Sequence, residues 1–241
     1  MTADQSTTMV ISAEDVEAIE KVWADQRIDD AQLREQETQD TLRQRWANHL
    51  GTTWSELVAN LRSTIRAQLW VVVRSPIGRP SPALLAALGT AVGWLADPYR
   101  ASWSRVAGDS HKPEWTPDLE WHTDSTGWPQ PNDVTALTCL KAAATGGPTD
   151  LLTLDTVQRT GIDEAALTTL AGADFAWPLD APDYSAALDP GDSLLFDNTR
   201  CLHRRGELSD PDRQRLLLRT KFFWQPRDWL HGQARQRAIT S

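Results

Sequence analysis

Two short segments, far apart in the chain, constrain most strongly what this 241-residue sequence can fold into. The first contains His122 and Asp124, and the second contains His203 shortly after the apolar run 194–196. Side chains alternate along a β-strand, so His122 and Asp124 are expected to project to the same side of a strand end. An antiparallel partner strand would bring His203 to the same point. Two imidazoles and one carboxylate are the ligand set of a non-haem iron(II) centre with open coordination positions.

The periodicity of apolar residues predicts which elements carry these segments. The first quarter of the chain has helical spacing, as in Leu57, Leu61 and Ile65. A further helix is expected at 83–88, opened by Ser81-Pro82 and stopped by Gly89. Short strands bounded by turn signals are expected at 69–73, 134–140, 151–154, 193–196 and 216–223.

Helices followed by a set of short strands predict an α+β, mostly β fold. We expect a double-stranded β-helix, or jelly roll, with flanking N-terminal helices. The chain length permits a single domain over 1–241. Within it we expect a helical part at 1–68, the jelly-roll core at 69–225 and a C-terminal tail at 226–241.

Composition and charge restrict the partners of such a protein. The formal charge of −9 argues against a nucleic-acid partner, because phosphate binding requires a basic face. No apolar run reaches the ~18 residues expected of a membrane-spanning helix. The N-terminus lacks the cationic and apolar regions of a secretory signal, and there are two cysteines, Cys139 and Cys201. We therefore expect a cytoplasmic protein with a small-molecule partner and no membrane or nucleic-acid partner; its oligomeric state stays open.

Four segments, taken in their order along the chain, carry a resemblance to a known family. They are 119–124, 144–150 with Asp155 further on, 191–203 and 215–219. Together they resemble the Fe(II)/2-oxoglutarate-dependent dioxygenase superfamily, and in particular its taurine-dioxygenase-like (TauD/TfdA) branch. The resemblance covers about residues 69–225.

The resemblance implies roles for individual residues. His122, Asp124 and His203 would be the metal ligands, and Fe(II), 2-oxoglutarate and O2 would be the cofactor and cosubstrates. Arg219 would bind the distal carboxylate of 2-oxoglutarate with Thr149 beside it, since a guanidinium pairs bidentately with a carboxylate. Arg215 is expected on the same strand face as Arg219, where it would either bind the other carboxylate or line the sheet. No catalytic residue beyond the metal ligands is predicted.

The family pattern also implies a reaction. Related halogenases have a small residue in place of the carboxylate ligand, so Asp124 favours hydroxylation. The expected substrate is a small polar molecule with an unactivated C–H bond, such as an amino acid or a natural-product precursor. Trp128 and Arg105 are candidate substrate contacts. Asp197 and Asn198 are candidates either for orienting the histidine ligands or for capping a turn. Three further arginines could anchor an anionic substrate: Arg74, Arg79 and Arg100.

Two alternatives stay open on the residues alone. A jelly-roll metalloprotein of the cupin type, for example an isomerase, would need the metal ligands but not Arg219. A non-catalytic binding jelly roll would use some of the twelve Trp residues as a platform. The former would bind metal without 2-oxoglutarate turnover, and the latter would do neither.

Overall fold

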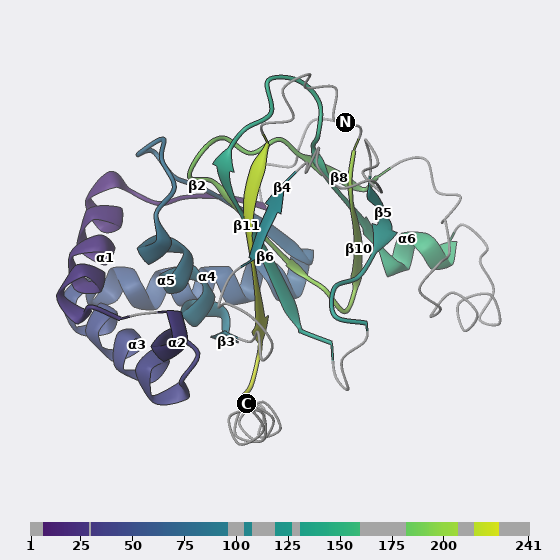
Figure 1. The fold of residues 1–241 in the computed structure, drawn as a ribbon. Helices are drawn as coiled ribbons and strands as arrows, with labels where there is room; N and C mark the ends of the chain where they lie inside the picture. The colour runs from purple at the N-terminus through teal and green to yellow at the C-terminus, as the bar shows by residue number, and fades with distance from the viewer. Residues whose placement is uncertain are drawn as a thin grey trace, which may run out of the picture.

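A layer of helices packs against a pair of β-sheets in the computed structural model of the chain (Figure 1). The structure describes residues 7–28, 30–95, 104–107, 119–126, 131–159, 182–206 and 215–226. The helices are α1 (Ala13–Gln26), α2 (Asp30–Leu33), α3 (Gln36–Leu50), α4 (Thr52–Gln68), α5 (Pro82–Val92) and α6 (Leu154–Arg159). The strands are β1 (Thr8–Val10), β2 (Trp70–Arg74), β3 (Trp94–Leu95), β4 (Ser104–Ala107), β5 (Leu119–His122), β6 (Val134–Lys141), β7 (Thr149–Thr153), β8 (Tyr184–Ala186), β9 (Ser193–Asp197), β10 (Cys201–Arg205) and β11 (Leu216–Phe223).

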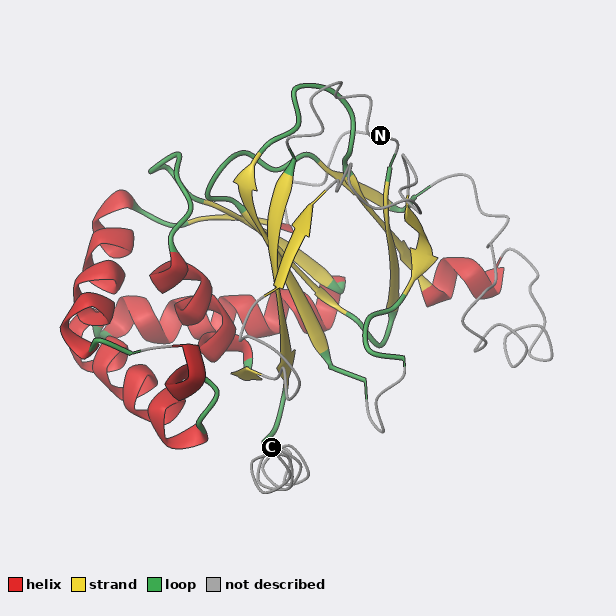
Figure 2. Ribbon diagram, in the orientation of Figure 1, coloured by secondary structure: helices red, strands yellow, loops and turns green. Residues whose placement is uncertain are grey.

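The strands form one large and one small sheet. The large sheet has the order β1-β2-β9-β6-β11-β3, with β4 also pairing with β11, and the small sheet has the order β5-β10-β7-β8. Helices α1–α5 lie on one side of the large sheet, and the small sheet lies on the other (Figure 2). This arrangement confirms the predicted mixed fold with a jelly-roll core and N-terminal helices.

Alternation along the strands distributes the apolar side chains between two cores. On β11, Leu218 and Phe222 pack with the buried residues of α1–α5, whereas Leu217 belongs to a second cluster. That second cluster joins the sheets, since it includes Leu137 of the large sheet and Leu151 of the small one. By the period of two, Arg219 shares the face of Leu217 and points toward the small sheet.

The helices differ from expectation at one informative place. Helix α5 does not stop at Gly89 but continues to Val92. Gly89 is there for close packing, because a Cβ atom on it would lie 2.1 Å from Cε1 of Phe222. Ser81 caps the N-terminus of α5 as predicted, accepting a hydrogen bond from the backbone N–H of Leu84 at 3.2 Å.

Two other features of the helical part were not predicted. Within the expected helical part, α2 and α3 are two separate helices rather than one continuous helix. Strand β1 lies within the expected helical part and pairs in parallel with β2 at the edge of the large sheet. Among the described residues, no helix is long and apolar enough to cross a membrane.

Gly93, directly after α5, lies against the backbone of the large sheet and gives a stability prediction. A Cβ atom there would lie 2.0 Å from the backbone oxygen of Phe223. Gly93→Ala is therefore expected to lower the free energy of unfolding by about 3 kcal/mol, since backbone must move to relieve the overlap. The control is Gly78→Ala, whose Cβ would meet nothing within 4 Å and which costs only about 1–2 kcal/mol of left-handed strain. Urea unfolding measures both, and equal losses would contradict the prediction.

Candidate metal centre

The register of two neighbouring strands brings the imidazoles of His122 and His203 together. Strands β5 and β10 are antiparallel, with His122 directly opposite His203. The ring centroids of the two histidines lie 4.1 Å apart. Asp124 follows β5, and the three donor atoms of His122, Asp124 and His203 all lie within 4.8 Å of one another. The structure thus brings together the three residues expected to bind metal.

The protonation of both histidines suits metal binding. Nδ1 of His122 lies 2.8 Å from the backbone oxygen of Glu120. A carbonyl oxygen only accepts, so Nδ1 carries the proton and Nε2 keeps its lone pair for an ion. Burial, with a smaller effect of the neighbouring His122, lowers the pKa of His203 to about 3, so the His203 ring is neutral at pH 7.

Asp124 is 4% exposed, and its two carboxylate oxygens have different partners. Oδ1 accepts a hydrogen bond from Nη1 of Arg219 at 2.7 Å and lies 3.8 Å from Nζ of Lys221. Oδ2 accepts a hydrogen bond from Oγ1 of Thr135 at 3.1 Å and lies 4.0 Å from Nε2 of His203. Burial acts to raise the pKa of Asp124, but its surroundings, which include the cations of Arg219 and Lys221, hold the pKa below its usual value. The carboxyl is therefore an anion, ready to bind a cation.

Asn198 holds the backbone of Asp124 in place. Its Oδ1 accepts from the backbone N–H of Asp124 at 2.8 Å, and its Nδ2 donates to the backbone oxygen of Asp124 at 3.1 Å. Asp197, the other expected orienting residue, accepts hydrogen bonds from the backbone N–H and the hydroxyl of Thr199 and so stabilises the turn between β9 and β10. Of the two candidates, Asn198 is the one that supports the metal centre, through Asp124 rather than through a histidine.

The arginine that contacts Thr149 is Arg215. Its Nη2 donates to Oγ1 of Thr149 at 2.8 Å, and the Arg215 side chain is buried. Burial, with a smaller effect of Arg205, lowers the pKa of Arg215 to about 10, so the guanidinium stays charged at neutral pH. The expected neighbour of Thr149, Arg219, instead pairs with Asp124. The reason is the position along the chain: Arg215 lies directly before β11 and reaches the end of β7, where Thr149 pairs with Arg205.

The structure describes some of the residues expected to contact substrate and not others. Trp128 and Arg100 lie outside the described residues. For Arg105 the structure describes only the backbone, which pairs with Leu218 in the large sheet. Arg79 forms an ion pair with Glu20 of α1, and Arg74 pairs with Asp192. Those two arginines serve the scaffold, so the expectation that they bind substrate is not supported.

Two polar side chains near the centre were missed. Lys221, whose side chain is 12% exposed, donates a hydrogen bond to Ser125 at 2.8 Å. Lys221 lies two residues after Arg219 on β11, so strand alternation places both side chains on the same face and could have predicted its position near the centre. Thr135 sits inside an apolar strand, where a threonine is ordinary, so its contact with Asp124 had no sequence signal.

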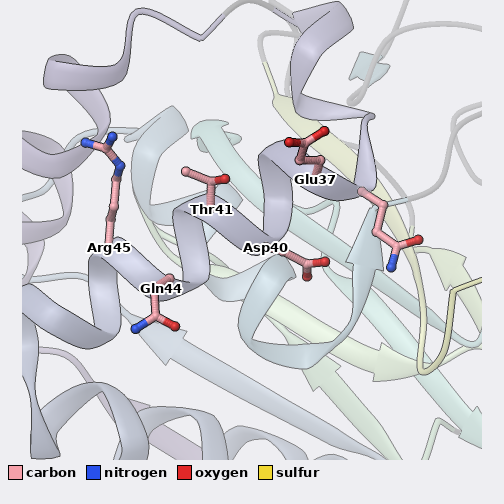
Figure 3. Close-up of a pocket in the computed structure, with 6 residues that line it drawn as sticks. Glu37, Asp40, Thr41, Gln44 and Arg45 are labelled. Carbon is pink, nitrogen blue, oxygen red and sulfur yellow. The ribbon is translucent and has the colours of Figure 1, made fainter.

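A surface hollow lies away from the cluster (Figure 3). It measures about 680 Å³ and is lined by side chains of α3. The lining residues are Gln36, Glu37, Asp40, Thr41, Gln44 and Arg45. No member of the metal cluster lies among them, so the chemistry is assigned to the cluster and not to the hollow.

The protein has a jelly-roll fold with two histidines and one carboxylate gathered beside its small sheet. This ligand set is typical of the class of non-haem iron oxygenases. Comparison with known families agrees, since residues 55–153 match the model described as "Taurine catabolism dioxygenase TauD, TfdA family". A search of curated protein sequences gives no significant match. The resemblance to the TauD/TfdA branch is thereby confirmed.

Solved structures share the fold over nearly the whole chain. An asparagine oxygenase in complex with Fe(II), 2S,3S-3-hydroxyasparagine and succinate has a TM-score of 0.66 at 17% sequence identity, with 91% of this chain and 94% of that chain covered. The non-haem iron oxygenase OrfP, in complex with Fe, succinate and (3R,4R)-dihydroxy-L-Arg, has a TM-score of 0.56 at 15% identity, with 90% and 94% covered.

Proposed function

We propose that this protein is an Fe(II)- and 2-oxoglutarate-dependent oxygenase that hydroxylates an unactivated C–H bond of a small amino acid or a related natural-product precursor. The observation that carries the proposal is the convergence of His122, Asp124 and His203 from two strands and the turn after one of them. The donor set fits iron, because two neutral imidazoles and one carboxylate leave three positions of an octahedral ion open.

The metal and the cosubstrate supply the oxidising chemistry when bound, because oxidative decarboxylation of 2-oxoglutarate to succinate and CO2 activates O2 for C–H oxidation. The protein supplies position and charge. Nε2 of His122 and Nε2 of His203 act as neutral donors, and Asp124 provides the negative charge. Nη1 of Arg219 donates a hydrogen bond to Oδ1 of Asp124 at 2.7 Å and so helps to keep the Asp124 carboxylate ionised.

Arg215 and Thr149 bind the distal carboxylate of 2-oxoglutarate. The pair is supported by its preformed contact of 2.8 Å and by the burial of both side chains. A charged guanidinium together with a hydroxyl provides several donors for two carboxylate oxygens. Arg219, expected from the family pattern to bind this carboxylate, serves instead beside the metal ligand Asp124.

An amino acid substrate is supported by chemistry on the same face. Arg219 and Lys221 place two cations beside the metal ligand Asp124, and an amino acid brings a carboxylate that such a face attracts. The asparagine and arginine derivatives bound to the two compared oxygenases agree with this class.

A cytoplasmic location is part of the proposal. Cys139 and Cys201 are both free and buried. Burial raises the pKa of Cys201 to about 12 and that of Cys139 to about 11, so both thiols stay protonated. Free buried thiols fit a reducing compartment.

The test is succinate release in the presence of O2. Protein, Fe(II) and 2-oxoglutarate are incubated with each standard amino acid in turn, and succinate and the amino acid product are measured by mass spectrometry. We expect faster succinate release with at least one amino acid, together with a product heavier by one oxygen atom. A protein that binds Fe(II) but releases no succinate with any of them would support the cupin-type alternative, and one that binds no Fe(II) would support the binding jelly roll.

A further inference from the structure

The carboxylate of Asp124 is the last acceptor in a chain of hydrogen bonds in which every donor points toward it. Oδ2, the oxygen that faces His203, accepts a hydrogen bond from the hydroxyl of Thr135 at 3.1 Å. Oδ1 faces away, toward Arg219 and Lys221. An ion bound between His203 and Asp124 must therefore bind the same oxygen that Thr135 contacts.

The direction of the Thr135 hydroxyl is fixed by its other neighbour. Nδ2 of Asn132 lies 2.9 Å from Oγ1 of Thr135 and 3.0 Å from the backbone oxygen of Val134. A carbonyl oxygen only accepts, so the Asn132 atom is the amide nitrogen, which only donates. The hydroxyl of Thr135 is thus the acceptor from Asn132, and its single proton is left for Asp124.

The chain continues outward to a cation. Oδ1 of Asn132 accepts from the hydroxyl of Ser125 at 2.8 Å, and Oγ of Ser125 accepts from Nζ of Lys221 at 2.8 Å. An ammonium only donates, so every bond from Lys221 through Ser125, Asn132 and Thr135 to Asp124 points the same way. Bonds aligned in this manner polarise one another and strengthen the last one, to Oδ2.

Burial makes the arrangement rigid. Thr135 and Asn132 are fully buried, and Asn198 is 1% exposed. Asn198 fixes the backbone of Asp124 and also donates to the backbone oxygen of Asn132 at 3.0 Å. The backbone and the side chain of Asp124 are therefore held by separate groups, and Thr135 donates to the oxygen that faces His203.

We propose that Thr135 is a positioning residue for the metal: its hydroxyl, directed by Asn132, fixes the rotation of the Asp124 carboxylate so that Oδ2 faces the ion. The proposal rests on the proposed metal-binding function. It predicts that the affinity for the metal depends on a hydroxyl at position 135 and on an amide at position 132.

The test is anaerobic calorimetric titration of the full chain with Fe(II). Thr135→Val, which keeps the shape but removes the hydroxyl, is expected to weaken Fe(II) binding about 10–100-fold, as loss of a partner of a metal ligand does. Thr135→Ser keeps the hydroxyl and is expected to bind nearly as the unsubstituted protein does. Asn132→Asp presents an acceptor to Thr135, turns its proton away from Asp124 and is expected to weaken binding as Thr135→Val does.

The matched control is Thr138→Val, the same substitution on the same strand at a buried threonine that bonds Ser193. It is expected to leave the Fe(II) affinity unchanged. Thermal unfolding of the metal-free variants separates the two effects, because a purely structural role would lower the melting temperature without changing the affinity. Unchanged affinity in Thr135→Val and Asn132→Asp, or equal losses in Thr135→Ser and Thr135→Val, would overturn the proposal. No Fe(II) binding by the unsubstituted protein would instead contradict the proposed function itself, and this inference with it.

Discussion

Replacing His203 by alanine is expected to abolish Fe(II) binding and succinate formation. His203 is buried opposite His122 and is held neutral by burial, so its loss removes one of three donors and opens the centre to water. Loss of an outer partner of a metal ligand already costs about 10–100-fold in affinity or activity, and loss of a ligand itself is expected to exceed that range. Calorimetric titration with Fe(II) and the succinate assay measure the two effects.

His49→Ala is the control for that experiment. His49 lies exposed in the last turn of α3, away from the cluster, and its replacement should leave both measurements unchanged. Circular dichroism should show the same fold in both variants. A His203→Ala protein that keeps its fold and still binds Fe(II) as tightly as the unsubstituted chain would remove His203 from the ligand set.

Replacing Arg215 by methionine is expected to raise the KM for 2-oxoglutarate about 100-fold while Fe(II) affinity stays nearly unchanged. Methionine keeps an apolar stem in the buried site but removes the charged donors that meet the distal carboxylate. Removing one partner of a buried charge pair costs about 2–5 kcal/mol, and about 2.7 kcal/mol corresponds to 100-fold. The KM is measured from succinate formation at varied 2-oxoglutarate.

Two further variants make this prediction specific. Thr149→Val removes one hydrogen bond from an uncharged donor and is expected to raise the same KM less, by about 10-fold. Arg219→Met removes the partner of Asp124 and is expected to weaken Fe(II) binding more than it raises the KM for 2-oxoglutarate. A large rise of that KM in Arg219→Met, with none in Arg215→Met, would restore the assignment drawn from the sequence pattern.

The sequence could predict the features that depend on local periodicity. His122 and Asp124 share a face because strands alternate, and His203 lies beside them because β5 and β10 are antiparallel. The short β-branched and leucine runs became strands β2, β6, β7, β9 and β11. The alternation and the strands needed only the order of residues along single elements, whereas the position of His203 also needed the expected antiparallel pairing of two strands.

The features that depend on contacts between elements could not be predicted. Arg215 and Arg219 have the same parity on an extended segment, so alternation could not decide which one meets Thr149. The way the large sheet packs on the small one decides it, since Arg215 reaches Thr149 and Arg219 reaches Asp124. Gly89 looks like a helix stop in the sequence, but the ring of Phe222 against it explains the glycine. Thr135 of β6 contacts Asp124, which follows β5, and gives no local signal.

The most direct test of the central claim is the visible spectrum of the protein under anaerobic conditions after Fe(II) and then 2-oxoglutarate are added. If His122, Asp124 and His203 hold one iron ion with adjacent open positions, 2-oxoglutarate chelates it and a metal-to-ligand charge-transfer band grows in until one equivalent of Fe(II) is bound. Folded protein that gives no such band at saturating Fe(II) and 2-oxoglutarate would contradict the account.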